Sequence, residues 1–259
     1  MSRSRDIADS TKTLDVDGGT IKLDGNYPTG TANVALGDAA LDDGSLSGSY
    51  NTALGAASFG NLTSGTANLA VGAYAGQNHT TGSYNVFVGQ EAAVGNTTGS
   101  FNTAVGRTAL YSNTTASNNT AVGYQAGYSN TTGTRNTYMG NGSGYSNSTS
   151  NDSSAFGQNS QNATTGTTNS SFGASSLRAN TSGANNTSLG GYSMRLNTTG
   201  SSNVAVGRDA LYSNTTASNN TAVGYQAAYS NSTGTEITAV GKGAMSSNTT
   251  GNYNTAVGY

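Results

Sequence analysis

Few residues in this chain of 259 could take part in catalysis or bind a metal. It has one histidine, His79, no cysteine and twelve acidic residues, of which eight lie within residues 1–43. An enzyme that cuts polysaccharide needs an acid pair in a groove, yet the later acids are only Glu91, Asp152, Asp209 and Glu236. No glycine-rich phosphate loop or nucleophile elbow stands out either. The sequence therefore predicts no catalytic residue, no metal site, no cofactor and no enzyme.

His79 stands alone at a repeat position where most other units have Asn, and no acid recurs nearby, so we interpret it as a polar substitution in a turn. The ten Lys and Arg residues are few and scattered, which argues against nucleic-acid binding by a basic patch. No apolar run is long enough to span a membrane as a helix, and the polar start MSRSRDIADS has no apolar segment typical of a secretory signal.

Aromatic residues recur at fixed spacing, and they are the best candidates for ligand contact. One set shares a single repeat position and consists of Tyr111, Tyr128, Tyr145, Tyr212 and Tyr229; another consists of Tyr50, Tyr84, Phe101 and Tyr253. Two interpretations stay open. The rings could pack at seams between subunits, or they could be stacking platforms for sugar rings on an Asn- and Thr-rich surface. We name the first set as the expected glycan contacts.

A 17-residue repeat must position these side chains. A glycine recurs in register at Gly37, Gly55, Gly72, Gly89, Gly106, Gly123, Gly140, Gly157, Gly173, Gly190, Gly207, Gly224, Gly241 and Gly258. The interval from Gly37 to Gly55 is longer than the others by one position, and that from Gly157 to Gly173 is shorter by one. Such regular units predict a solenoid, which needs little core per residue and so tolerates a hydrophobic content of only 33%.

Each unit resembles N-T-A-V-G-x-x-A-L-x-x-N-T-T-G, and N-T-A-V is typical of a short strand with alternating faces. The residue before each glycine is always bulky and apolar, its neighbour is mostly Ala, and the third residue after the glycine is only Ala or Ser. We therefore expect two short strands per coil around a narrow interior of small side chains. The bulky apolar row should face outward and be buried against other subunits. Its predicted interface residues are Leu54, Val71, Val88, Val105, Val122, Val206, Val223 and Val240.

Asn recurs twice per unit, so stacked coils should form two amide ladders. The first holds Asn33, Asn51, Asn68, Asn85, Asn102, Asn119, Asn136, Asn169, Asn186, Asn203, Asn220 and Asn254, and Ser153 and Ile237 interrupt it. The second holds Asn96, Asn113, Asn130, Asn147, Asn180, Asn197, Asn214, Asn231 and Asn248.

The predicted fold is all-β, a parallel β-solenoid or β-roll of about 14 coils over residues 33–259. Residues 1–32 lack the repeat and form a separate N-terminal attachment or capping segment, in which residues 20–25 could be a lone strand. The stack ends without an atypical capping unit, which suggests that a C-terminal portion of a longer product is absent.

The N-x-A-V-G core resembles the S-V-A-I-G motif of YadA-like head repeats in trimeric autotransporter adhesins, over residues 33–259. That resemblance implies a left-handed parallel β-roll that assembles as a homotrimer. The 17-residue unit is longer than is usual there, and no signal peptide, stalk or anchor is visible. Longer units of the type NTAVGYQAL…NTTG resemble those of bacteriophage tail fibres.

The tail-fibre resemblance implies a homotrimeric virion fibre that attaches to a host-surface glycan or protein. The N-terminal segment, with Arg3, Arg5, Asp6 and Asp9, would then dock to a phage tail or other virion protein. One alternative is a bacterial surface adhesin or extracellular fibre of the same repeat. A remote alternative is an ice-binding solenoid.

Overall fold

The structure is a computed structural model that describes residues 14–16, 19–21 and 31–259, and this part of the chain consists of strands and turns without a helix. The strands are β1 (Leu14–Val16), β2 (Gly19–Ile21), β3 (Val34–Leu36), β4 (Thr52–Leu54), β5 (Leu69–Val71), β6 (Val86–Val88), β7 (Thr103–Val105), β8 (Thr120–Val122), β9 (Thr137–Met139), β10 (Ser154–Phe156), β11 (Ser170–Phe172), β12 (Thr187–Leu189), β13 (Val204–Val206), β14 (Thr221–Val223), β15 (Thr238–Val240) and β16 (Thr255–Val257).

Strands β1 and β2 form an antiparallel pair in which Asp15 lies opposite Thr20. The strand predicted alone at 20–25 is therefore one half of a hairpin, and residues 22–25 lie outside the described residues. The predicted virion-docking residues Arg3, Arg5, Asp6 and Asp9 also lie outside them.

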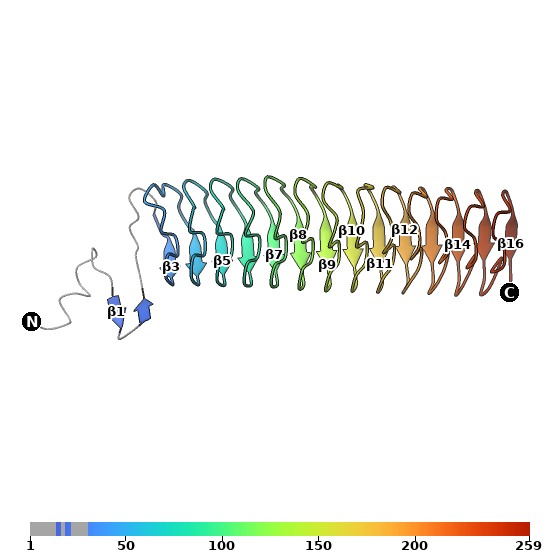
Figure 1. The fold of residues 1–259 in the computed structure, drawn as a ribbon, viewed down its shortest axis with the longest axis horizontal. Helices are drawn as coiled ribbons and strands as arrows, with labels where there is room; N and C mark the ends of the chain where they lie inside the picture. Colours follow the sequence, from blue (N-terminus) through green and yellow to red (C-terminus); the bar gives the residue numbers. More distant parts are fainter. Residues whose placement is uncertain (1–13, 17–18, 22–30) are drawn as a thin grey trace, which may run out of the picture. The chain divides into compact units, whose positions relative to one another are not determined.

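The other fourteen strands follow chain order in a parallel sheet, which confirms the predicted all-β solenoid (Figure 1). The chain divides into two compact units at residues 119 and 120, so that β3–β7 belong to unit 1 and β8–β16 to unit 2. Within each unit, every strand points the same way as its neighbour, and a loop completes each coil.

The sheet register follows the glycine alignment, including the two repeats of irregular length. Regular coils keep the 17-residue offset, as in Thr221 opposite Thr238. Val34 pairs with Thr52, which is one position beyond that offset, and Ser154 pairs with Ser170, which is one position short of it. The extra and missing residues are therefore absorbed outside the strands.

Alternation along each strand divides interior from surface as the sequence predicted. The middle residue of every strand from β3 to β15 is buried, and it is Ala in most coils. The first and third residues point outward and are half-buried or exposed. The small residue three positions after each glycine is also buried, as at Ala92 and Ser176.

The prediction of two strands per coil is wrong, because each coil in residues 31–259 has one strand of three residues. The rest of the coil bends at recurring left-handed positions. In the coil that starts with β6, Glu91, Ala93 and Phe101 have φ values of 57°, 49° and 58°. These loops still bond coil to coil, for example from the Ala93 N–H to the Ala109 carbonyl at 2.8 Å. Hydrogen bonding between stacked loops thus offsets a conformation that costs about 1–2 kcal/mol for each non-glycine residue.

Both predicted asparagine ladders are present, and their side chains fill the interior. In the first, the Asn68 side-chain oxygen accepts the backbone N–H of Asn85 at 2.9 Å and its side-chain N–H at 3.0 Å. In the second, the Asn214 amide donates to the Asn197 oxygen at 2.7 Å. These four side chains are buried, so the ladders supply the polar contacts that a thin core needs.

Large interior side chains are accommodated by glycine in a neighbouring loop. A Cβ on Gly76 would lie 2.6 Å from the Phe59 ring and 2.7 Å from the Phe87 ring. A Cβ on Gly144 would likewise meet the buried ring of Tyr138 at 2.3 Å. Space freed at one loop position is therefore used by an aromatic side chain from another position.

Candidate functional site

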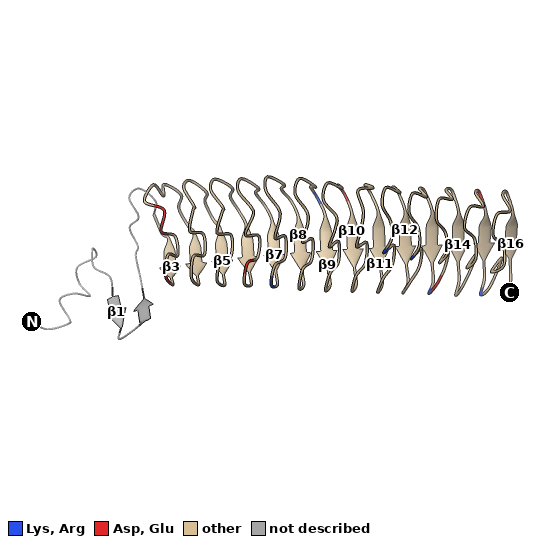
Figure 2. Cartoon of the chain, in the orientation of Figure 1, with Lys and Arg blue, Asp and Glu red and all other residues tan. Residues whose placement is uncertain are grey.

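The outer face of the sheet carries no charged side chain on any strand from β3 to β16. Figure 2 shows these strand arrows in tan, with acidic and basic residues confined to the loops. The first outward position is Thr, Ser, Val or Leu, and the third is Val, Leu, Met or Phe. Monomeric soluble proteins rarely expose a long contiguous apolar row, so this face is the main candidate for a contact surface.

The third outward residues form the apolar row that the sequence predicted. Its named members Leu54, Val71, Val88, Val105, Val122, Val206, Val223 and Val240 are all half-buried on the outer face. Within unit 2 the row widens at Phe156 and Phe172, whose rings stack with centroids 4.7 Å apart. Leu189, the next member, is 48% exposed. The outward placement is confirmed, and contact with another subunit stays a prediction.

The predicted glycan contacts form a second line, the tyrosine row, five positions after each glycine. Its members Tyr111, Tyr128, Tyr145, Tyr212 and Tyr229 are all half-buried. In unit 2, Tyr128 stacks on Tyr145 at 5.0 Å, and Tyr212 stacks on Tyr229 at 5.1 Å. Stacking covers ring faces and leaves ring edges outward. Sugar contact by these tyrosines stays a prediction, and it would have to use those edges or an uncovered end face.

Arg195 continues the tyrosine row and was not predicted as part of it. Its guanidinium lies 5.9 Å from the centre of the Tyr212 ring and donates a hydrogen bond of 3.0 Å to the Tyr212 hydroxyl. The same group also lies 5.2 Å from the ring centre of Tyr192. The 17-residue offset between Arg195 and Tyr212 was the signal that could have found this contact.

The other aromatic set is more exposed. We define the aromatic row as the residues that directly precede the first-ladder positions. In unit 1 it includes Tyr50, Tyr84 and Phe101, which are 68%, 58% and 57% exposed. Tyr84 stacks on Phe101 with centroids 5.1 Å apart and planes 8° apart. Of the two sets, this one offers more open ring surface.

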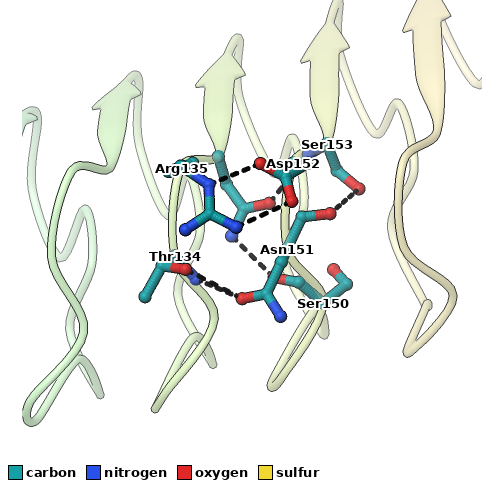
Figure 3. A network of polar contacts seen from close by, with 7 residues as sticks. Thr134, Arg135, Ser150, Asn151, Asp152 and Ser153 are labelled. Atoms are coloured by element: carbon teal, nitrogen blue, oxygen red, sulfur yellow. Dashed lines mark hydrogen bonds and ion pairs between the residues drawn. The ribbon is translucent and has the colours of Figure 1, made fainter.

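The corresponding row in unit 2 carries an ion pair. Figure 3 shows Arg135 and Asp152 facing one another from neighbouring coils, with bonds of 2.6 and 2.9 Å to the two carboxylate oxygens. Hydrogen bonding from Arg135 holds the pKa of Asp152 below its usual value. Beside the pair, the Asn151 oxygen accepts the backbone N–H of Thr134 at 2.7 Å. Each of these residues has a partner one coil away, so the cluster fits a structural contact between coils.

His79 is buried in the interior, at a position that Asn occupies in the second ladder. Its ring lies between Phe59 and Phe87, at centroid distances of 5.5 and 5.7 Å. The Nε2–H group donates to the Gly82 carbonyl at 2.9 Å, and Nδ1 accepts from the Asn96 amide at 2.8 Å. His79 thus occupies an asparagine-ladder position as a neutral ring, and burial lowers its pKa from 6.5 to about 4.

Acid should therefore weaken the coils around His79. Its folded pKa lies below the unfolded value of 6.5, so its contribution to stability is complete above that pH and is lost as pH falls toward 4. A proton on Nδ1 would also face the Asn96 amide donor, and none of the groups bonded to the ring in the described part of the chain is titratable. We expect a loss of about 3 kcal/mol between pH 7 and pH 4, measured by denaturant unfolding.

The variant His79→Asn is the matched control for this prediction, because Asn occupies the same ladder position at Asn96 and Asn113. It should unfold with a clearly smaller dependence on pH, whatever its stability at pH 7. An equal pH dependence in both proteins would contradict the assignment to His79.

The described residues include no group of three His, Asp or Glu side chains that could hold a metal ion. In the same part of the chain, no helix is long and apolar enough to cross a membrane. Comparison with protein families, with characterised proteins and with solved structures finds no match for this chain.

Proposed function

We propose that this protein is the homotrimeric shaft of a virion fibre, such as a phage tail fibre, that attaches the particle to a host surface. Residues 1–32 would dock to a phage tail or other virion protein, and the coils would hold and present the contacts with the host. The observation that carries the proposal is the outer sheet face, which is uncharged and presents one bulky apolar side chain in every coil.

The best occupant for this face is another copy of the same chain. A repeating row of outward Val, Leu, Met and Phe is matched coil by coil only by a surface with the same spacing. Depletion of charge is also typical of the centre of a protein interface. Three copies facing one axis would bury the apolar row, as the resemblance to trimeric head repeats implies. Several trimers on one particle would then multiply weak contacts with a glycan.

The oligomeric state tests the first half of this proposal. Light scattering should give three times the chain mass of 25.8 kDa. The double variant Val206→Glu/Val223→Glu should be monomeric, because the interface would have to bury unpaired carboxylates. The control Thr199→Glu/Thr216→Glu places the same charges on exposed loop residues of neighbouring coils and should stay trimeric. A monomeric parent protein would refute the trimer.

The location of the protein tests the second half of the proposal, that it forms a fibre on a virus particle. Antibodies against residues 120–259 should label fibres on virus particles from a host that carries the gene. Labelling of the bacterial surface instead, with a signal or anchor encoded in the full gene, would favour the alternative of a surface adhesin or extracellular fibre.

One observation favours the ice-binding alternative enough to test it. Thr221 and Val223 both point outward from β14, and Thr238 and Val240 repeat them in register on β15. Regular rows of this kind can order water if they stay exposed. A monomer that shows thermal hysteresis would favour ice binding, and a trimer without hysteresis would exclude it.

A further inference from the structure

The aromatic row of unit 1 has one position without a ring. Tyr50, Ala67, Tyr84 and Phe101 occupy equivalent positions in successive coils, and all four have φ between 55° and 61°. The backbone N–H of Ala67 donates to the Ser49 carbonyl, and that of Tyr84 to the Thr66 carbonyl, each at 3.0 Å. The four side chains therefore leave the stack from the same kind of backbone site.

Ring spacing shows how large the gap at Ala67 is. Tyr84 and Phe101, one coil apart, stack at 5.1 Å and nearly parallel, so Phe101 covers one face of the Tyr84 ring. The other face of Tyr84 points toward the coil of Ala67. Tyr50 lies one coil beyond it, and the described residues show no ring contact between Tyr50 and Tyr84. Two coil spacings separate the two tyrosines by about 10 Å.

A gap of this width fits one further ring. A ring midway between the tyrosines would lie about 5 Å from each, inside the range of about 4.5–7 Å over which aromatic centroids stack. The Ala67 methyl group can form the floor without filling the space. Tyr50 is also the more exposed of the two, at 68% against 58% for Tyr84, as expected for a ring with no stacked neighbour.

The surroundings of the gap favour a neutral ligand with hydroxyl groups. No Asp, Glu, Lys or Arg occurs from Gly44 to Gln90. The Ser83 hydroxyl oxygen accepts the Thr66 backbone N–H at 3.0 Å and the Thr66 hydroxyl at 3.3 Å, so it reaches the coil of Ala67 and its own proton can donate to a ligand. The Ser49 oxygen instead accepts from Thr31, in the coil on the other side of Tyr50 from the gap. Hydroxyls beside stacked rings and no charge match a neutral sugar better than a phosphate or an acidic glycan.

The gap is also held by a rigid interior. Phe59, His79 and Phe87 are fully buried in these coils and contact one another. Asn68, which follows Ala67, is bonded to the ladder residues on both sides. A site that is already ordered loses little entropy when it binds a small ligand.

We propose that Tyr50 and Tyr84 bind one neutral hexopyranose ring between them, over Ala67. The C–H groups of the sugar pack against the two tyrosine faces, and the Ser83 hydroxyl contacts its rim. This site deepens the proposed attachment function by naming the surface that meets a host glycan, but its binding can be measured whether or not the protein is a virion fibre.

Saturation-transfer NMR tests the site with four probes: the methyl pyranosides of galactose, glucose, mannose and N-acetylglucosamine. We expect ring-proton signals from at least one of them. Ala67→Phe should weaken that binding at least tenfold, because a phenyl ring would fill the gap as Phe101 fills its own position. Tyr84→Ala should weaken it similarly by removing one wall. The control Ser202→Phe adds the same ring at the equivalent position of unit 2 and should leave binding unchanged.

Several results would overturn the site. They are the absence of signal from all four sugars, unchanged binding by Ala67→Phe, or a changed oligomeric state in Ala67→Phe, which would place the row at a subunit seam. Light scattering separates this failure from failure of the proposed function. A trimer that binds no sugar refutes the site alone, and a monomer whose sugar binding depends on Ala67 refutes the trimer alone.

Discussion

Replacing Gly190 by alanine should destabilise the coils around β12 by at least about 3 kcal/mol, while the same change at Gly191 should leave them intact. Gly190 has a φ of 141°, which L side chains rarely adopt, and a Cβ there would lie 2.5 Å from the Gly207 carbonyl oxygen. Both the strained backbone and the clash must be relieved by moving one coil away from the next. Gly191 has open space at its Cβ position, so alanine should be neutral or stabilise slightly by restricting the unfolded chain.

Hydrogen exchange measures this prediction better than a single melting curve. Stacked coils depend mainly on their nearest neighbours, so a local defect need not unfold the whole chain at once. In Gly190→Ala, amides of β12 and β13 should lose protection while those of β15 keep it. Equal protection of the β12 amides in Gly190→Ala and Gly191→Ala would show that the close approach of Gly190 to Gly207 is not required for stability.

The second large loss of stability is expected when Asn68 is replaced by alanine. The Asn68 side chain donates to the Gly82 carbonyl at 3.0 Å and to the Asn51 oxygen at 3.1 Å, and its own oxygen accepts two bonds from Asn85. Asn68→Ala leaves these buried partners without bonds at a place that water cannot reach. We expect a loss of about 3 kcal/mol, since each buried group left unpaired costs about 1–3 kcal/mol.

The control is Asn61→Ala, which deletes the same amide from an exposed loop residue with a single side-chain bond of 3.3 Å to Asn78. It should change stability by less than about 0.5 kcal/mol. Denaturant unfolding of the two variants gives the comparison. If both lose the same stability, the ladder contributes no more than a surface amide and its predicted role is wrong.

Features that depend on repetition could be predicted from the sequence. The glycine alignment predicted the strand register in the regular coils, and it also located the two irregular offsets, the longer one at Val34–Thr52 and the shorter one at Ser154–Ser170. The alternation of Ala with Val predicted which side chains point inward, because a strand has only two faces. The buried ladders followed from the same spacing.

Features that depend on contacts between different positions of the repeat could not be predicted from the sequence. Nothing in the residue type of Thr108 or Leu110 indicates a left-handed backbone, yet their φ values are 54° and 49°. These bends are set by the closure of the whole coil, and they prevent the second strand that was expected. The repeat alignment gave the ladder position of His79, but it could not show that the ring packs between Phe59 and Phe87, which come from other positions of other coils.

The direction of the hydrogen bonds determines how the stacked coils within unit 1 or unit 2 would open under tension. Bonds between neighbouring strands and loops run from coil to coil, so a pull along the stack would load them one coil at a time. Each opened coil would release one repeat of the chain, which extends by about 50 Å beyond its rise in the stack. An attachment made through such coils would therefore lengthen in steps under load. The opening of each coil would dissipate energy before the attachment itself breaks.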